Sequence, residues 1–284
     1  MTNWLPVLGQ GACFLGERSE TAHMEKAALL RGLSLGMNLF DTAESYGGGG
    51  SERLIGDMLR ARLFKRDDVV IMTKLSPGNA SPPALYESCD NSLRRLGADY
   101  IDVYLLHWRE AATDLAGAAR GMEELARRGK ILRWGVSNFD VGDMEELFAT
   151  PDGANCRVNQ ALYHIGSRGA EYDLLPWLRE HGVAPVAYCP LAQGGTQRRT
   201  AQDFLTSPAL RSVAKKYAAS VFQVMLAFVI RSGDICAVPK SSSVAHVEEN
   251  AAARELARLI TASDWLELDG AYPPPTYKMH LDMD

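Results

Sequence analysis

The sequence predicts a single (β/α)8 barrel domain that spans residues 1–284. Strand and helix patterns alternate from one end of the chain to the other, which is typical of a parallel α/β protein. Most of the strand patterns are short and apolar throughout, as expected for strands that are buried on both faces. The length also suits one barrel, and no linker or low-complexity segment marks a domain boundary.

Eight apolar runs are candidate strands, and together they favour a closed barrel. They cover residues 7–12, 37–41, 69–74, 101–107, 131–137, 157–160, 184–189 and 235–240. Helical patterns lie between them, most clearly at 82–96 and 114–129, where apolar side chains recur along one face. Two prolines stand at the start of the first helix and Gly129 at the end of the second, positions that these residue types favour. An open, doubly wound sheet is the alternative that the same alternation allows.

The composition argues against several classes of function. The net charge of −5, from 30 basic and 35 acidic residues, is unlike the basic excess of a nucleic-acid-binding protein. No apolar run approaches the length of a membrane span, and the first residues do not resemble a secretory signal. The five cysteines are widely spaced without a CxxC motif, which indicates neither a disulfide framework nor a zinc site. We therefore expect a cytoplasmic monomer with a small-molecule partner and no nucleic acid, membrane or metal.

Polar residues stand where the predicted strands end, which is where barrel enzymes carry their chemistry. Asp41, Lys74 and His107 each close a strand and are spaced 33 residues apart, one strand–helix unit each. Tyr46 lies in the loop that follows Asp41. The other strands end in Ser137, Asn138, Gln160, Tyr188, Lys240 and Ser241. All of these side chains are expected to converge on one barrel mouth.

The types of these residues suit proton transfer. A buried Lys74 needs a countercharge, which Asp41 can supply. A cationic Lys74 beside Tyr46 would lower the phenol pKa from about 10, so that Tyr46 could donate a proton near neutral pH. His107 could then orient a carbonyl group or share the proton. Singly, each residue also has a structural interpretation as a helix cap, a solvated lysine or a packed histidine, and Lys74 could instead form a Schiff base in a barrel lyase.

Five segments of the chain carry a family resemblance. They are FDTAESYGGGGSE (40–52), IMTK (71–74), YLLHW (104–108), WGVSN (134–138) and AVPKS (237–241). Together they resemble the aldo-keto reductases over essentially the whole chain. The resemblance implies hydride transfer from a nicotinamide C4 to a carbonyl carbon, with Tyr46 as proton donor. It also implies a catalytic tetrad, which maps to Asp41, Tyr46, Lys74 and His107.

The resemblance further implies an NADPH site across the barrel mouth. Ser137, Asn138 and Gln160 would hold the nicotinamide carboxamide, and Tyr188 would stack on the ring. The remaining cofactor contacts would be Pro190, Leu191, Lys240, Ser241, His246, Glu249 and Asn250, with Lys240 and Ser241 at the phosphates and Glu249 and Asn250 at the adenine. A Rossmann fingerprint is absent, because Phe14 stands where its third glycine would be needed.

Two departures from the family pattern concern selectivity. His246 replaces an arginine that many members place on the cofactor 2′-phosphate, so a modest NADPH preference that strengthens towards pH 6 is expected and NADH remains possible. The alternative is that His246 only caps or packs on its helix. Cys13 replaces a pocket tryptophan, so the pocket should be wider on that side, with Phe14 partly filling the gap and Trp108 forming another wall.

The substrate expectation rests on the tail and on two local segments. The tail at 272–284 is too short to build much of a lid, which favours small polar carbonyls. The chain resembles most a bacterial branch with methylglyoxal reductases and 2,5-diketo-gluconate reductases, and segments 163–177 and 245–253 resemble the methylglyoxal type. We expect 2-oxoaldehydes such as methylglyoxal as substrates. The alternative function is a cofactor-binding regulatory subunit with little turnover, because the same fold occurs as an ion-channel auxiliary subunit.

Overall fold

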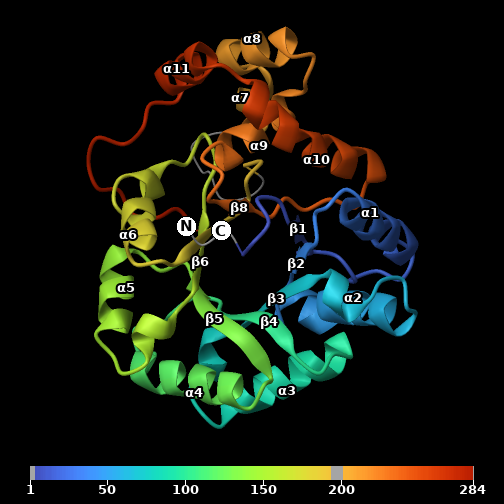
Figure 1. Ribbon diagram of the computed structural model, residues 1–284, viewed down its shortest axis with the longest axis vertical. Coiled ribbons are helices and arrows are strands. Elements are labelled where there is room, and N and C mark those ends of the chain that lie inside the picture. The colour runs from blue at the N-terminus through green and yellow to red at the C-terminus, as the bar shows by residue number, and fades with distance from the viewer. Residues whose placement is uncertain (1–3, 193–200, 284) are drawn as a thin grey trace.

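The computed structural model describes residues 4–192 and 201–283, and its centre is one sheet of eight parallel strands in sequence order. The strands form the inner ring of Figure 1, with most helices outside it. Their bounds are β1 Gln10–Gly11, β2 Leu39–Asp41, β3 Val70–Leu75, β4 Ile101–Leu106, β5 Ile131–Ser137, β6 Val158–Leu162, β7 Ala184–Tyr188 and β8 Cys236–Ala237. All eight predicted strands are therefore present.

The sheet closes between its first and last strands. Leu8 pairs with Ala237 and Gly11 with Lys240 as isolated parallel bridges, and the Gly11 amide donates to the Pro239 carbonyl at 3.0 Å. These contacts confirm the barrel and exclude the doubly wound sheet. The predicted runs 7–12 and 235–240 were too long, since only two residues of each form a regular ladder. Pro239 has no amide proton, which interrupts the ladder of β8 there.

The helices have the bounds α1 Ala22–Ser34, α2 Gly50–Arg60, α3 Ala84–Leu96, α4 Leu115–Arg127, α5 Val141–Phe148, α6 Leu174–Glu180, α7 Ala201–Leu205, α8 Pro208–Lys216, α9 Val221–Ile230, α10 Val244–Leu259 and α11 Ala262–Ala271. The two helices predicted at 82–96 and 114–129 are α3 and α4. Each begins one or two residues after its predicted start, and in α4 the first predicted residue caps the helix. The Asp114 carboxylate, for example, accepts the Gly117 amide at 2.9 Å.

Successive side chains on each strand point alternately into the barrel and outward to the helices, which gives two apolar layers. On β4, Val103 and Leu105 point into the barrel, whereas Tyr104 and Leu106 pack outward against the helices. The inner cluster contains Leu39, Met72, Val103, Leu105, Val158, Ala184, Val186, Cys236 and Val238. The barrel interior is thus a packed core, and polar side chains can gather only where the strands end.

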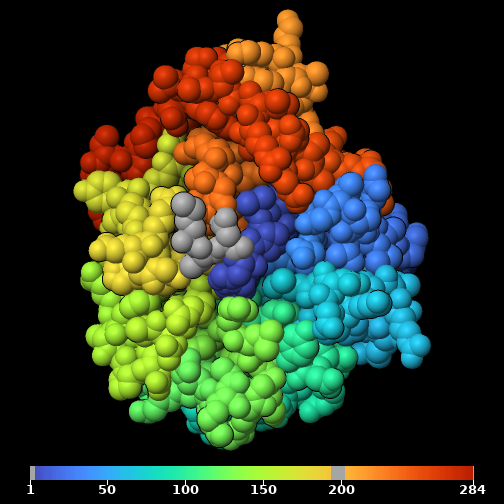
Figure 2. Space-filling model, in the orientation of Figure 1, coloured from blue at the N-terminus to red at the C-terminus, as the bar shows by residue number. Residues whose placement is uncertain are grey.

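The C-terminal helices gather on one side of the barrel, next to α1. Figure 2 shows them as one red and orange mass beside the blue of α1. An ion pair of 2.8 Å between Arg31 on α1 and Glu248 on α10 joins the two ends of the chain. Within the described residues no single helix is long and apolar enough to cross a membrane, although α8 and α9, bent by 90° at their junction, would pass as a pair by length and composition.

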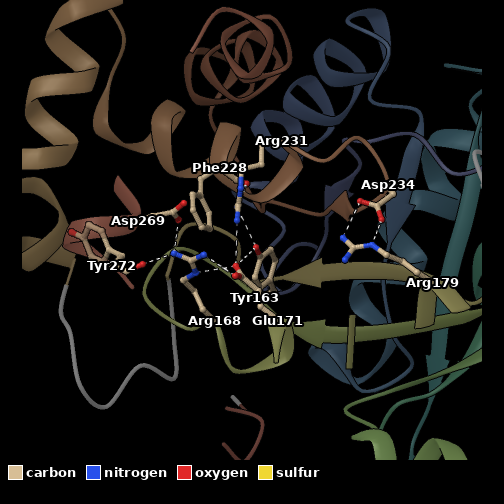
Figure 3. A network of polar contacts seen from close by, with 9 residues as sticks. All are labelled: Tyr163, Arg168, Glu171, Arg179, Phe228, Arg231, Asp234, Asp269 and Tyr272. Carbon is tan, nitrogen blue, oxygen red and sulfur yellow. Dashed lines mark hydrogen bonds and ion pairs between the residues drawn. The ribbon is translucent and has the colours of Figure 1, made fainter. Parts of the chain in front are cut away.

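A polar network fixes the loop after β6 against α9 and α11 (Figure 3). The buried Arg168 makes two bonds to the Glu171 carboxylate, at 2.9 and 2.7 Å, and one to Asp269 at 2.7 Å. Arg231 also reaches Glu171, and its guanidinium lies 3.5 Å from the ring centroid of Phe228. Burial alone would raise the pKa of Glu171, but the bonds from Arg168 and Tyr163 hold that pKa below its usual value.

Candidate active site

The C-terminal ends of the strands surround a cavity of about 670 Å³. Its lining includes Asp41, Tyr46, His107, Trp108, Ser137, Asn138, Gln160, Tyr188, Pro190, Leu191, Lys240, Cys13 and Phe14, together with Met283. The strand-end residues that the sequence singled out do converge, as the barrel topology requires. One cavity therefore holds most of the predicted site.

Lys74 lies beneath this cavity and is 0 % exposed. Its ammonium donates to the Asp41 carboxylate at 2.7 Å, to the Thr42 carbonyl at 2.9 Å and to the Tyr46 hydroxyl at 3.3 Å. A buried cation is stable only when it is paired and hydrogen-bonded, and here all three protons have acceptors. The same engagement leaves no room for a substrate carbonyl, which argues against a Schiff base on Lys74.

Gln160 supports the countercharge from across the barrel. Its side-chain amide donates a hydrogen bond of 2.9 Å to the same Asp41 oxygen that accepts from Lys74. The two residues are 119 positions apart in the chain, so only the closed barrel brings them together. This contact adds to the role that the resemblance implied for Gln160.

His107 is neutral over the physiological range. Burial, with a smaller contribution from the Lys74 ammonium, lowers the pKa of His107 to about 3. Its ring lies edge-on to Tyr46 at 5.7 Å between centroids and 4.8 Å from Trp108. Its Nδ1 atom is buried without a hydrogen-bond partner among the described residues. A neutral imidazole at this position can orient a carbonyl oxygen without adding charge beside Lys74.

The end of β5 forms the opposite wall. Asn138 adopts the left-handed backbone conformation (φ 63°), which asparagine tolerates better than most residues. Its side chain accepts from the Tyr188 hydroxyl at 2.8 Å and donates to the His107 carbonyl at 3.1 Å. This turn links strands β4, β5 and β7 at the cavity and places the buried Ser137 next to Asn138.

The predicted substrate wall faces the cavity mouth. Cys13, Phe14 and Trp108 all line the cavity, and Phe14 is 69 % exposed. Burial raises the pKa of the Cys13 thiol, although the Lys74 ammonium partly opposes this, so the thiol form dominates. Cys13 is thus a small, uncharged side chain at the position where a bulkier one would narrow the cavity.

The chain end also reaches the cavity, which sequence reasoning missed. In Figure 1 the red tail runs from α11 past α6 towards the barrel axis, and Met283 lines the cavity. The Lys278 ammonium bonds to Asp140 and Asp173, the residues that precede α5 and α6. No local pattern in the tail indicated this contact, because it depends on Asp140 and Asp173, which lie more than a hundred positions earlier in the chain.

Four predicted cofactor residues lie outside the cavity, on the segment that begins α10. The Ser241 hydroxyl accepts the Ser243 amide at 3.0 Å, and Ser243 in turn caps α10. His246 and Glu249 are exposed, whereas Asn250 is buried. Lys240 is the residue of this segment that lines the cavity. The segment continues from the cavity along the helix, as an extended ligand would require.

Known proteins resemble the chain over nearly its full length. The family model described as "Aldo/keto reductase family" matches residues 7–273. Methylglyoxal reductase YeaE of Escherichia coli is 42 % identical over 279 residues, which cover 98 % of this chain and 95 % of that protein. An aldo/keto reductase from Klebsiella pneumoniae, solved with NADP and acetate, superimposes with a TM-score of 0.92 at 42 % identity and covers 99 % of this chain and 96 % of that one. The chain therefore belongs to the aldo/keto reductase family.

Proposed function

We propose that this aldo/keto reductase reduces small aldehydes and ketones to alcohols, with NADPH as hydride donor and Tyr46 as proton donor. The observation that carries the proposal is the contact of 3.3 Å between the Lys74 ammonium and the Tyr46 hydroxyl at the base of the cavity. A phenol becomes an effective acid near neutral pH only when a nearby cation stabilises its phenolate. Lys74 supplies that cation, and the Asp41 carboxylate pairs with it.

The four residues then have separate tasks. Tyr46 gives its proton to the carbonyl oxygen as negative charge develops there. Lys74 stabilises the resulting phenolate, and Asp41 holds Lys74 at 2.7 Å. His107, which is neutral, directs the carbonyl oxygen by a hydrogen bond and does not compete as an acid. These groups are held in place before the substrate arrives, which is the usual source of catalytic power in such a site.

The cavity suits a nicotinamide cofactor. Bound NADPH would supply the hydride. Ser137 and Asn138 at the end of β5 and Gln160 in the middle of the neighbouring β6 line the cavity and offer the hydroxyl and amide groups that a carboxamide needs. Tyr188, whose hydroxyl is tied to Asn138, would stack on the ring beside Pro190 and Leu191. Lys240 and Ser241 would meet the phosphates, and His246, Glu249 and Asn250 the adenosine end. The similar Klebsiella pneumoniae enzyme was crystallised with NADP and with NADPH.

We favour 2-oxoaldehydes such as methylglyoxal as substrates. The names of two relatives support this choice: methylglyoxal reductase YeaE and methylglyoxal reductase DkgA, the latter 30 % identical over 249 residues. Cys13 leaves space beside Tyr46, and Met283 bounds the mouth. A substrate with two adjacent oxygens could use both the Tyr46 hydroxyl and the His107 imidazole.

The test is NADPH consumption with methylglyoxal, measured for the wild-type protein and for Tyr46→Phe. We expect wild-type turnover and a fall in kcat of two to four orders of magnitude, roughly, in the variant, because the proton donor is lost. NADPH binding, followed by fluorescence, should change less than about twofold because the ring remains. A wild-type protein that binds NADPH but turns over neither methylglyoxal nor a panel of simple aldehydes would instead be a regulatory subunit.

Cofactor preference tests the role of His246. If its imidazolium binds the 2′-phosphate, the ratio of kcat/KM for NADPH over NADH rises as the pH falls from 8 towards 6. In His246→Arg the ratio should be higher and should not rise as the pH falls, because arginine is charged at every pH in this range. A wild-type ratio that does not change with pH would remove His246 from the cofactor site.

We also propose that the chain acts as a monomer in the cytoplasm. Every side chain of the proposed mechanism comes from one chain, and no disulfide joins cysteines in the described part of the chain, which suits a reducing compartment. Sedimentation equilibrium measures the first point, and a dimer at micromolar concentration would contradict it. Fractionation of the source cells measures the second.

A further inference from the structure

The loop that carries Tyr46 is fastened to the segment that follows Lys74. Glu44 lies two residues before Tyr46, and its Oε1 atom accepts the Ser76 amide at 2.6 Å and the Asn79 side-chain amide at 3.0 Å. The Glu44 backbone amide also donates to the Lys74 carbonyl at 3.1 Å. One residue thus joins the loop after β2 to the loop after β3 by three hydrogen bonds.

The other side of Tyr46 offers little support of this kind. Gly47, Gly48 and Gly49 follow it, all with positive φ values between 55° and 82°. Glycines carry no side chain with which to anchor a loop, and they permit more backbone freedom than other residues. Arg53 holds this stretch through the Gly48 carbonyl at 3.0 Å. Apart from the bonds that Lys74 itself makes to Thr42 and Tyr46, the Glu44 side chain therefore links this loop to the segment after β3.

We propose that Glu44 is a positioning residue that sets the distance between the Tyr46 hydroxyl and the Lys74 ammonium. The inference rests on the proposed function of Tyr46 as proton donor. Glu44 is absent from the cavity lining, so it acts through the loop and not by touching the reactants. The Lys74–Tyr46 contact of 3.3 Å is the longest of the three that Lys74 makes, so a small loop displacement would break it first.

The geometry supplies a matched pair of variants. Both side-chain bonds converge on one oxygen of Glu44, so the amide oxygen of Glu44→Gln can accept them, whereas Glu44→Ala cannot. Both variants remove the same charge. We expect kcat for methylglyoxal reduction at saturating NADPH to fall about tenfold in Glu44→Ala and less than about twofold in Glu44→Gln, because misplacing a catalytic group is costly. The KM for NADPH should be unchanged in both.

The pH profile separates position from charge. In alcohol oxidation Tyr46 acts as the base, so the rate rises with pH through its apparent pKa. Among the described contacts, the Tyr46 hydroxyl meets the Lys74 ammonium, which is paired with Asp41, while Glu44 lies two residues away and His107 is neutral. Loss of the Glu44 charge alone lowers this pKa equally in both variants, but separation from Lys74 raises it only in Glu44→Ala. We expect the apparent pKa of Glu44→Ala to exceed that of Glu44→Gln by about half a unit or more.

Asn79→Ala is a second variant that weakens the hydrogen bonding of Glu44 and keeps the charge of its carboxylate. It removes one of the two side-chain bonds, so kcat should fall to a value between those of wild type and Glu44→Ala, and the apparent pKa should rise. This variant carries the test alone if the thermal midpoint of Glu44→Ala shows that it does not fold. Glu145→Ala, on the exposed face of α5, is the control and should match wild type.

The outcomes distinguish a failure of the positioning role of Glu44 from a failure of the proposed function. If wild type turns over but Glu44→Ala and Glu44→Gln share the same kcat and the same apparent pKa, the positioning role is wrong and only the charge matters. If folded Glu44→Ala and Asn79→Ala both match wild type, Glu44 has no role in catalysis. A wild-type protein without turnover would overturn the proposed function first.

Discussion

At the scale of single residues, burial and long-range contacts determine the protonation and the partners of the polar groups around the cavity. Asp41, Lys74 and His107 could be placed together because each ends a strand of one barrel. The neutral state of His107 could not, since its pKa depends on burial that only the folded chain creates. The bond from Gln160 to Asp41 and the approach of Met283 to the cavity are long-range contacts without a local pattern.

The small side chain of Cys13 in the cavity lining predicts which sizes of aldehyde the protein accepts. Cys13→Trp would place an indole in the cavity beside Phe14, so bulky aldehydes should lose more than small ones. We expect kcat/KM for an aromatic aldehyde to fall at least tenfold, roughly, and that for methylglyoxal to change less than about threefold. The measurement is steady-state kinetics with both substrates. Unchanged selectivity would show that Cys13 does not form a substrate wall.

At the scale of elements, helix and strand existence followed from periodicity, whereas their ends followed from individual contacts. The run 235–240 reads as one strand, but Pro239 leaves a regular ladder at Cys236–Ala237 only. The loop after β6 has no periodicity, yet Arg168 and Glu171 join it to α11 and to the end of α9. Such networks join residues a hundred positions apart, which no local pattern encodes.

The network around Arg168 and Glu171 predicts that removing one charge lowers the stability of the protein strongly. Glu171→Gln keeps the shape of the side chain but leaves Arg168 and Arg231 without their shared countercharge. Because Arg168 is buried, we expect the free energy of unfolding to fall by about 2–4 kcal/mol. Urea denaturation at pH 7 measures it. Glu180→Gln on the exposed face of α6 should change stability by less than about 0.5 kcal/mol, and equal effects of the two variants would contradict the assignment.

At the scale of the whole molecule, the barrel itself was the most predictable feature. Eight apolar runs with intervening helices allow few closed arrangements, and the observed strand order follows the chain from β1 to β8. A second global property, sensitivity to acid, could not be predicted. We expect it because His107 and His164 fold into positions where burial keeps the imidazole neutral.

His164 makes that sensitivity testable. It is 0 % exposed, and burial lowers its pKa to about 4, although Asp282 opposes the shift. The unfolded chain binds a proton near pH 6.5 and the folded chain does not, so stability is full above pH 6.5 and is lost as the pH falls towards 4. We expect the titration of His164 to lower the free energy of unfolding by about 2 kcal/mol between pH 6.5 and pH 5.

Urea denaturation across this pH range is the measurement, with His164→Asn as the comparison. The asparagine oxygen can replace Nδ1 of His164 as acceptor of the Gly166 amide, at 3.0 Å in the wild type, but it does not titrate. The variant should lose less stability on acidification, whatever its stability at pH 7. Parallel pH dependences for the two proteins would contradict the buried neutral state.

The closure between β1 and β8 has a consequence for motion. Only isolated bridges, Leu8 with Ala237 and Gly11 with Lys240, pair this junction in the described residues. The Gly9 and Gly11 amides that donate across it are therefore where the barrel opens with least loss of contact. Lys240, one of the proposed phosphate ligands, pairs with Gly11 at the same junction. A cofactor bound there would therefore stabilise the junction against local opening. It would slow amide hydrogen exchange at Gly9 and Gly11 far more than in the long strands β3 to β5.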